Sequence, residues 1–437
     1  MRYWENPSTN EQGNFVFGGC DTVALAREYG TPLYVMDEQR IRSICRGFQK
    51  TLEDKGVEGM VLYASKAFST KAIYKIVHEE GLGADVVSGG ELYTALAAGF
   101  PPEKIYLHGN NKTPAEIEMA IDADIARIVI DSHEEIRLIA AIAKEKGKTV
   151  PVSLRVKPGI EAHTHEYIMT GTDDSKFGLG IYDGEALDAV EEILRCPELS
   201  LIGLHSHIGS QIFELEPFVI ATERLTDFLV TVRNRFGATL SEINFGGGFG
   251  ISYTDEDAAI QPYAYVSAMI DNLREQCAAK DLPMMRFVIE PGRSIVGDAG
   301  VTLYTVGTVK HIPDIRTYVS VDGGMTDNPR FALYQSKYTA LLANKPLAPK
   351  SETVTVAGRC CESGDKLILD AKLPPCEAGD TLCVFSTGAY NYSMASNYNR
   401  LPIPAVVLAN NGEAGLMVAR QTWDQLLEND RIPSWLK

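Results

Sequence analysis

Short apolar runs alternate with longer amphipathic segments through the first two thirds of the chain. Eight runs have the length and character of buried strands, at residues 61–64, 84–87, 104–107, 127–130, 152–156, 201–205, 242–245 and 287–289. Helical spacing of apolar residues fills most of the intervals, at 91–98, 114–121, 134–146, 187–194, 217–235 and 263–279. This alternation predicts an α/β fold with a parallel sheet, and eight units are the number in a (β/α)8 TIM-like barrel. A doubly wound open sheet has the same periodicity and is the competing architecture.

The pattern changes after Arg293, where helical spacing disappears until residues 422–427. Strand-like runs separated by Gly, Pro, Asp and Asn cover 301–310, 317–321, 353–357, 366–369, 381–385, 405–408 and 416–419. One more strand is predicted at 32–36, before the barrel begins, and we expect it to pack with the C-terminal strands. The predicted domains are therefore a barrel at 37–293 and a β-rich sandwich or barrel made from 1–36 and 294–437.

Composition and charge narrow the function classes. The 437 residues are 45% hydrophobic and 23% charged, as in ordinary globular proteins, and their net charge is −17. Such an acidic chain is a poor candidate for binding nucleic acid, which requires Lys and Arg contacts to phosphates. No run approaches the 18 or so apolar residues of a membrane span, and the polar N-terminus lacks the apolar core of a signal peptide. The eight cysteines form no CxxC pair, so we expect reduced thiols in the cytoplasm.

The unusual residue clusters of the first domain all follow predicted strands. They are Tyr63-Ala64-Ser65-Lys66 after the first strand, His205-Ser206-His207-Ile208-Gly209-Ser210-Gln211 after the sixth, Gly246-Gly247-Gly248-Phe249-Gly250 after the seventh and Glu290-Pro291-Gly292-Arg293 after the eighth. Barrel enzymes build their active sites at the carboxyl ends of the strands and often hold phosphate after strands seven and eight. The glycine run allows backbone N–H groups to approach an anion, and Ser210 and Arg293 are suitable phosphate partners. A G-x-G-x-x-G dinucleotide motif is absent from this run.

A lysine, a phosphate site and a carboxylate together indicate pyridoxal phosphate. Lys66 follows a buried run, where desolvation favours the nucleophilic amine that forms a Schiff base, and Glu290 can pair with the protonated ring nitrogen. His207 can lie against the face of the ring. The plainer alternatives are a surface lysine, a structural salt bridge at Glu290 and a structural histidine. An HxH metal pair of His205 and His207 is disfavoured because no third ligand is evident, and we expect no metal.

Eight motifs in this order resemble the fold-type III pyridoxal-phosphate-dependent decarboxylases, the group that includes alanine-racemase-like and ornithine-decarboxylase-like enzymes. Besides Tyr63–Lys66, His207–Gln211 and Glu290–Arg293 they are His163-Thr164-His165-Glu166-Tyr167-Ile168, Ser175-Lys176-Phe177-Gly178, Asp322-Gly323-Gly324-Met325-Thr326-Asp327-Asn328-Pro329-Arg330, Cys361-Glu362-Ser363-Gly364-Asp365 and Gly388-Ala389-Tyr390-Asn391-Tyr392. The resemblance extends from about residue 32 to residue 404. It implies a homodimer whose active sites include residues from both subunits, with the β-rich domain contributing to the site and the interface.

The resemblance also implies a role for each site residue. Lys66 binds the cofactor covalently, His207 stacks on its ring and Glu290 partners its ring nitrogen. Around the cofactor phosphate or the substrate lie Ser210, Gly246, Gly247, Gly248, Pro291, Gly292 and Arg293. The distal carboxylate of the substrate is bound by Arg293, Arg330 and Tyr334, and Tyr390 contacts cofactor and substrate. Glu362 and Cys361 come from the partner subunit, Glu362 facing the distal amine and Cys361 donating a proton.

The implied activity is the decarboxylation of meso-2,6-diaminopimelate to L-lysine and CO2, the last step of lysine biosynthesis. The alternatives are a decarboxylase of another diamino acid, such as D-lysine or D-ornithine, and a non-catalytic cofactor-binding homologue. Retention of Arg330, Tyr334 and the Cys361-Glu362-Ser363 triplet favours a substrate with a distal carboxylate, and the intact Lys66 and Cys361 argue against a non-catalytic homologue. Phe331 and Ile403 depart from residues common in the family, Cys360 beside Cys361 leaves the proton donor ambiguous, and residues 161–176 are expected to form a mobile loop over the site.

Overall fold

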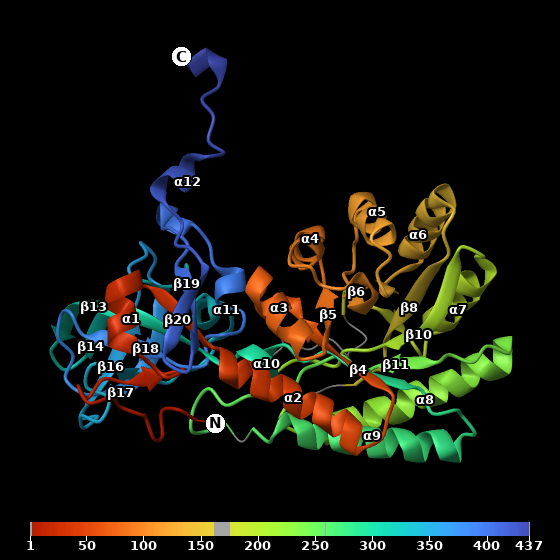
Figure 1. Ribbon diagram of the computed structural model, residues 1–437, viewed down its shortest axis with the longest axis horizontal. Coiled ribbons are helices and arrows are strands. Elements are labelled where there is room, and N and C mark those ends of the chain that lie inside the picture. Colours follow the sequence, from red (N-terminus) through yellow and green to blue (C-terminus); the bar gives the residue numbers. More distant parts are fainter. Residues whose placement is uncertain (1, 161–174, 258, 437) are drawn as a thin grey trace. The chain divides into compact units, whose positions relative to one another are not determined.

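The computed structural model describes residues 2–160, 175–257 and 259–436. Contacts divide the chain into two compact units (Figure 1). The β-rich unit consists of Met1–Ile41, Ser252–Asp257 and Val296–Lys437, and the barrel unit consists of Arg42–Ile251 and Ala258–Ile295. The predicted mobile loop lies outside the described residues over 161–174, as does the motif His163–Ile168.

The barrel unit contains a closed parallel sheet of eight strands. They are β4 (Gly59–Ala64), β5 (Gly83–Val86), β6 (Ile105–Leu107), β7 (Arg127–Ile130), β8 (Val150–Lys157), β10 (Leu199–His205), β11 (Glu242–Asn244) and β12 (Arg286–Ile289). Neighbours in this order pair in parallel, and β12 pairs with β4 to complete the circle. A two-residue strand, β9 (Leu179–Gly180), adds to β8 outside this circle. The barrel prediction is confirmed, and closure of the sheet excludes the doubly wound alternative.

Helices surround these strands (Figure 1). They are α2 (Glu38–Asp54), α3 (Lys71–Glu79), α4 (Gly89–Ala97), α5 (Pro114–Asp122), α6 (His133–Lys146), α7 (Glu185–Arg195), α8 (Glu216–Phe236) and α9 (Pro262–Ala279). N-terminal capping residues explain where several of these helices begin. Thr113 and Glu116 form a capping box at α5, and the Ser132 hydroxyl caps α6. The sequence patterns did not identify α2 and α3. Within the described residues, no helix is both long and apolar enough to cross a membrane.

The β-rich unit joins the first strands of the chain to the last. Its strands are β1 (Val16–Phe17), β2 (Cys20–Asp21), β3 (Leu33–Asp37), β13 (Gly300–Ile312), β14 (Arg316–Val321), β15 (Ala340–Leu342), β16 (Glu352–Ala357), β17 (Lys366–Leu373), β18 (Thr381–Val384), β19 (Ala405–Asn410) and β20 (Glu413–Val418). In the main sheet β3 lies between β13 and β19, antiparallel to the first and parallel to the second. The prediction that the N-terminal strand joins the C-terminal strands is confirmed. Short helices complete the unit: α1 (Thr22–Tyr29), α11 (Arg330–Tyr334) and α12 (Trp423–Leu427), while α10 (Arg293–Val296) connects it to the barrel in sequence.

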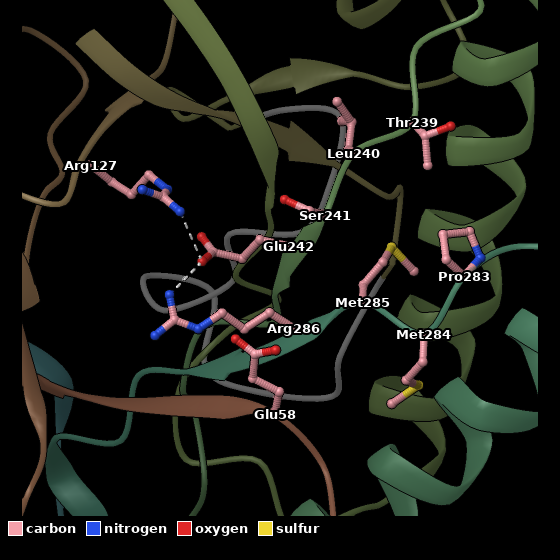
Figure 2. A pocket seen from close by; sticks show the side chains of 10 residues that line it. All are labelled: Glu58, Arg127, Thr239, Leu240, Ser241, Glu242, Pro283, Met284, Met285 and Arg286. Carbon is pink, nitrogen blue, oxygen red and sulfur yellow. Dashed lines mark hydrogen bonds and ion pairs between the residues drawn. The ribbon is translucent and has the colours of Figure 1, made fainter.

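A buried carboxylate closes the amino-terminal end of the barrel. Glu242 is 1% exposed, and its Oε2 accepts a hydrogen bond from the Tyr106 hydroxyl at 2.7 Å. The guanidinium groups of Arg127 and Arg286 approach the same oxygen at 3.3 and 3.4 Å from opposite sides (Figure 2). These three charged residues line a pocket of about 400 Å³ at this end. In barrel enzymes this end contributes stability rather than catalysis.

Replacing Glu242 with alanine should therefore lower stability without altering the opposite end. The change leaves two guanidinium groups and a tyrosine hydroxyl without their shared acceptor, and it should reduce the free energy of unfolding by about 3 kcal/mol. Urea denaturation of Glu242→Ala and of the wild type, followed by circular dichroism, measures this change. The control is Lys50→Ala, which removes an exposed Lys50–Asp54 pair and should change stability by less than about 0.5 kcal/mol. Equal denaturation midpoints for the wild type and Glu242→Ala would contradict the assigned role.

Candidate active site

The clusters expected from the sequence meet at the carboxyl end of the barrel. Lys66 lies in a single 3-10 turn (Ser65–Ala67) directly after β4, and His207 lies two residues after β10. The glycine run from Gly246 follows β11, and Glu290 follows β12. Because all eight strands are parallel and the sheet is closed, these four strand ends lie on one rim.

Lys66 differs in one respect from the sequence expectation. Its neighbours Ser65 and Ala67 are buried, but the Lys66 side chain itself is exposed rather than desolvated. The strand ends before this residue, so its side chain extends beyond the packed interior. Burial raises the pKa of Asp85 to about 6 and that of Glu91 to about 7, and the positive charge of Lys66 opposes both rises. The amine is therefore accessible and lies near two acidic groups.

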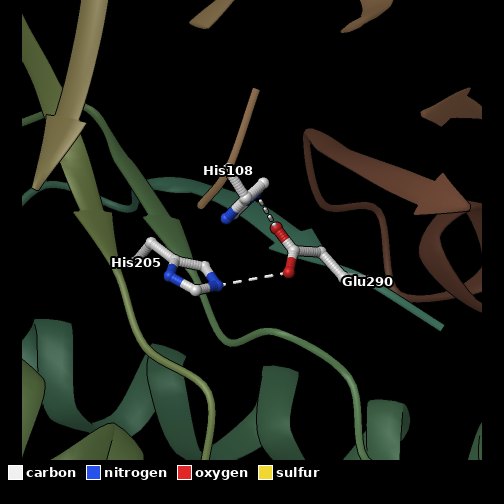
Figure 3. A group of neighbouring side chains, drawn as sticks. All are labelled: His108, His205 and Glu290. Atoms are coloured by element: carbon white, nitrogen blue, oxygen red, sulfur yellow. Dashed lines mark hydrogen bonds and ion pairs between the residues drawn. The ribbon is translucent and has the colours of Figure 1, made fainter. Parts of the chain in front are cut away.

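Glu290 is the most constrained ionisable group of this rim. It is 6% exposed, and its Oε1 accepts a hydrogen bond from the Asn244 amide at 2.6 Å. His205 Nε2 lies 3.2 Å from Oε2, and His108 Nε2 lies 2.8 Å from Oε1 (Figure 3). The His108 contact has ion-pair distance, but its N–H does not have the direction of a straight hydrogen bond. Burial alone raises the pKa of Glu290, yet the two histidines outweigh it and hold the pKa well below its usual range.

His207 is a neutral ring in this setting. Burial lowers its pKa well below the usual value, and the nearby charge of Lys66 lowers it further. Its Nδ1 accepts a hydrogen bond from the Gly247 N–H at 3.2 Å, which fixes the tautomer with the proton on the other nitrogen. A neutral imidazole of fixed tautomer is well suited to stack on a flat aromatic ligand.

The glycine run forms a cradle that side chains would fill. Gly246 has φ of +67°, and a Cβ there would lie 2.7 Å from the Ser206 carbonyl oxygen. Gly248 has φ of +107°, and its Cβ would lie 2.4 Å from the Gly209 carbonyl oxygen. Both positions therefore require glycine, because the left-handed backbone and the close neighbours each exclude a side chain.

A buried arginine supplies positive charge close to this cradle. Arg293 is 7% exposed at the start of α10, and its Nη2 donates to the Ser210 hydroxyl at 3.0 Å. The pairing joins the loop after β10 to the loop after β12. Gly292 precedes it, and a Cβ there would lie 2.9 Å from the Ala64 methyl carbon. A guanidinium group and a hydroxyl in one recess are suited to bind an anionic oxygen.

The disfavoured alternative, an HxH metal pair of His205 and His207, is not the cluster that the described residues bring together. His108, His205 and Glu290 have potential ligand atoms within 4.8 Å of one another, and His207 is not part of that group. The sequence analysis did not identify His108, the third member of this cluster. It follows β6 at the same rim, so its position after a buried strand was the available signal.

The β-rich unit contains a second set of expected residues around Arg330. This residue begins α11, is 7% exposed, and donates to the Tyr253 hydroxyl and to the Ser336 hydroxyl, both at 3.1 Å. Its guanidinium lies between 5.3 and 5.9 Å from the ring centroids of Tyr253, Tyr334 and Tyr390. Tyr253 was not expected, because it belongs to the segment Ser252–Asp257 that interrupts the barrel sequence.

Cys360 and Cys361 have different environments. Burial, followed by the charge of Asp365, raises the pKa of the Cys360 thiol to about 11, and its backbone N–H donates to Asp365. Cys361 is exposed, and its backbone N–H donates to the Asn399 side chain at 2.7 Å. Glu362 is exposed as well. In the single chain, Cys361 and Glu362 are thus accessible from outside.

Comparisons with known proteins agree with this arrangement. Residues 38–297 match the model of the pyridoxal-dependent decarboxylase family, pyridoxal binding domain. The diaminopimelate decarboxylase of Bacillus methanolicus is 52% identical over 421 residues, which cover 96% of this chain and 98% of the relative. The chain belongs to the pyridoxal-dependent decarboxylase family. The diaminopimelate decarboxylase of Bacillus subtilis (strain 168) is 49% identical, with 96% of each chain covered.

Solved structures of family members share the fold of the whole chain. The crystal structure of diaminopimelate decarboxylase from M. jannaschii superimposes with a TM-score of 0.91 at 36% identity and covers 100% of both chains. A second structure of that protein, in complex with L-lysine, has the same TM-score and identity and covers 99% of this chain and 100% of that one. The predicted family, cofactor and enzyme class are confirmed: the chain is a pyridoxal-phosphate-dependent carboxy-lyase.

The residues of the barrel rim fit this cofactor. An ionised, buried carboxylate suits the protonated ring nitrogen, a neutral imidazole suits the ring face, and an accessible lysine suits the aldehyde. The glycine run packs against the loop after β10 too closely for any Cβ, and the Arg293–Ser210 pair offers donors suited to phosphate oxygens. The N–H groups of Gly246 and Gly247 already bond to Asn244 and His207, whereas no acceptor among the described residues takes the Gly248 N–H. The individual residue assignments remain predictions.

A methyl group at Gly248 should test the cradle. Gly248→Ala introduces a side chain at φ +107° and against a carbonyl oxygen, so the loop must shift and the affinity for pyridoxal phosphate should fall about 10-fold or more. Titration of the cofactor-free protein, followed by absorbance, measures the dissociation constant. Gly90→Ala is the matched control, because only the Ser88 hydroxyl at 3.7 Å lies near that Cβ, in helix α4. A normal affinity in Gly248→Ala would show that this loop does not shape the cofactor site.

Proposed function

We propose that this chain decarboxylates meso-2,6-diaminopimelate to L-lysine and CO2. Relatives named diaminopimelate decarboxylase match almost its entire length at 43–52% identity, and a structural neighbour binds L-lysine. The product is an amino acid that keeps one of the two amino-acid ends of the substrate. The enzyme must therefore hold a distal amino-acid group while the other end reacts.

Arg330 carries this proposal. Its side chain is more than nine-tenths buried, and no carboxylate in the described part of the chain pairs with it. Its two assigned hydrogen bonds are to the neutral hydroxyl groups of Tyr253 and Ser336, and its Nε has no partner. A buried guanidinium without a counter-ion is unfavourable, so the site is completed by an anion. The distal carboxylate of diaminopimelate supplies that charge, whereas ornithine and lysine have none at that end.

The barrel residues hold the reacting end. Bound pyridoxal phosphate supplies an electron sink for the pair released when the bond between Cα and the carboxylate breaks. Lys66 anchors the cofactor covalently, His207 packs on its ring face, and Glu290 keeps the ring nitrogen protonated because its own pKa is low. Arg293 and Ser210 bind the phosphate or a substrate oxygen. The neutral state of His207 avoids placing a second cation against the ring.

Cys361 completes the reaction by protonating Cα after CO2 has left. The proton moves from Sγ to carbon, and the thiolate is reprotonated by solvent before the next cycle. The exposure of Cys361 and Glu362 supports a role toward a partner subunit, Glu362 facing the distal amine, in a homodimer with shared sites. The eight unpaired cysteines support a reducing, cytoplasmic setting.

A substrate panel tests the activity together with the role of Arg330. Purified protein with pyridoxal phosphate should release CO2 from meso-diaminopimelate, but not from lysine or ornithine enantiomers at comparable rates. Arg330→Gln should lower kcat/KM for diaminopimelate about 30-fold or more, mainly through KM, because the distal carboxylate loses its cation. Arg431→Gln, an exposed arginine near the C-terminus, is the control and should leave both constants unchanged. Turnover of D-ornithine or D-lysine without diaminopimelate turnover would overturn the proposal.

Mixed dimers test the proton donor and the shared site. Lys66→Ala and Cys361→Ala should each abolish most activity, while Cys360→Ala should retain it, because burial and the charge of Asp365 raise the pKa of the Cys360 thiol to about 11 and make it a poor proton donor. If each site takes Lys66 from one subunit and Cys361 from its partner, random mixing of the two inactive chains restores about one quarter of the wild-type activity. Mixtures that exchange subunits, shown by differently tagged chains, but recover no activity would rule out a site shared in this way.

A further inference from the structure

The side-chain amide of Asn244 joins two parts of the cofactor site. Asn244 is the last residue of β11, and it is 1% exposed. Its Nδ2 donates to Oε1 of Glu290 at 2.6 Å, and its Oδ1 accepts from the backbone N–H of Gly246 at 2.9 Å. A carboxylate only accepts and a backbone N–H only donates, so this orientation of the amide is fixed by chemistry.

The two linked parts have different tasks in the site. Glu290 is the carboxylate assigned to the ring nitrogen, and Gly246 begins the cradle that also orients His207 through the Gly247 N–H. A backbone hydrogen bond from the Glu290 N–H to the Gly246 carbonyl oxygen, at 2.8 Å, connects the same two loops. The loops are therefore held together by the main chain, and the amide of Asn244 sets how the carboxylate is turned relative to the cradle.

The histidines beside Glu290 cannot replace this amide. His108 contacts Oε1 without straight hydrogen-bond geometry, and His205 is 3.2 Å from the other oxygen. They help to keep the pKa of the carboxylate low. The 2.6 Å bond from Asn244 is the shortest contact to the carboxylate, and it is the one that restrains rotation about the last bond of the side chain.

We propose that Asn244 is a positioning residue that fixes the Glu290 carboxylate in the orientation required by the protonated ring nitrogen of pyridoxal phosphate. This inference rests on the proposed role of Glu290. Without the amide, the carboxylate remains buried and charged but can turn toward either histidine. Part of the interaction energy between the Glu290 carboxylate and the protonated ring nitrogen is then lost.

The test measures cofactor binding rather than turnover. The full-length chain is stripped of cofactor and titrated with pyridoxal phosphate and with its deaza analogue, in which C–H replaces the ring nitrogen. Asn244→Ala should lower the affinity for pyridoxal phosphate about 10-fold or more, because a hydrogen bond to a charged group is lost. The affinity for the analogue should fall much less. A merely structural loss would weaken both ligands equally. Asn244→Asp keeps the acceptor for Gly246 but places a second carboxylate against Glu290, so it should weaken pyridoxal phosphate at least as much as Asn244→Ala.

Two further variants separate the possible failures. Asn272→Ala, in helix α9, is the control of the same residue type and should leave both affinities unchanged. Glu290→Gln should remove most of the preference for pyridoxal phosphate over the analogue, and adding Asn244→Ala to it should then have little further effect. If Glu290→Gln keeps the preference, the role of Glu290 is wrong. If Glu290→Gln removes the preference for pyridoxal phosphate but Asn244→Ala keeps it, the positioning role of Asn244 is wrong and the role of Glu290 stands. The same holds if Asn244→Ala lowers the affinity for both ligands equally.

Discussion

Closure of the parallel sheet is the constraint on which the cofactor site depends. The pairing of β12 with β4 places the residues after β4, β10, β11 and β12 on one rim, although the first and the last of them are more than 200 residues apart in sequence. The same closure places the first residues of the strands on the other rim. A shift of register in one strand would therefore move residues at both rims.

Strand β11 shows how the two ends are separated over only three residues. Glu242 and Asn244 are two positions apart, so both side chains point to the same face of the strand. The charge of Glu242 is balanced by two arginines, which are always charged, so the ion pairs at that end are permanent. Glu290 at the other rim is contacted by two histidines and an amide, none of which is permanently charged. The choice of neighbouring groups thus distinguishes the structural carboxylate of Glu242 from that of Glu290, which is proposed to serve the cofactor.

Most of the architecture could be predicted because the buried strands are short, apolar and regularly spaced. All eight barrel strands were located within a few residues, and the rule that barrel sites lie at the carboxyl ends identified Lys66, His207 and Glu290 as one group. Helices α2 and α3 were missed, although the buried apolar residues of α2 (Ile41, Ile44, Cys45, Phe48 and Leu52) have regular helical spacing. Desolvation of Lys66 was wrongly inferred from its buried neighbours in sequence, since a strand end can project a side chain outward. The partnerships of Asn244, His108 and Tyr253 depend on distances between loops, and one sequence without a fold does not contain them.

The central position of β3 has a consequence for how the chain is made. This strand leaves the ribosome early, yet its partners β13 and β19 are translated about 270 and 370 residues later. Strand β3 must remain unpaired while the whole barrel is synthesised, and its five buried residues need protection during that time. The barrel sheet depends only on residues 59–289, so it can form first. Synthesis therefore gives the protein an order of assembly, in which the cofactor-binding barrel precedes the unit that carries Arg330.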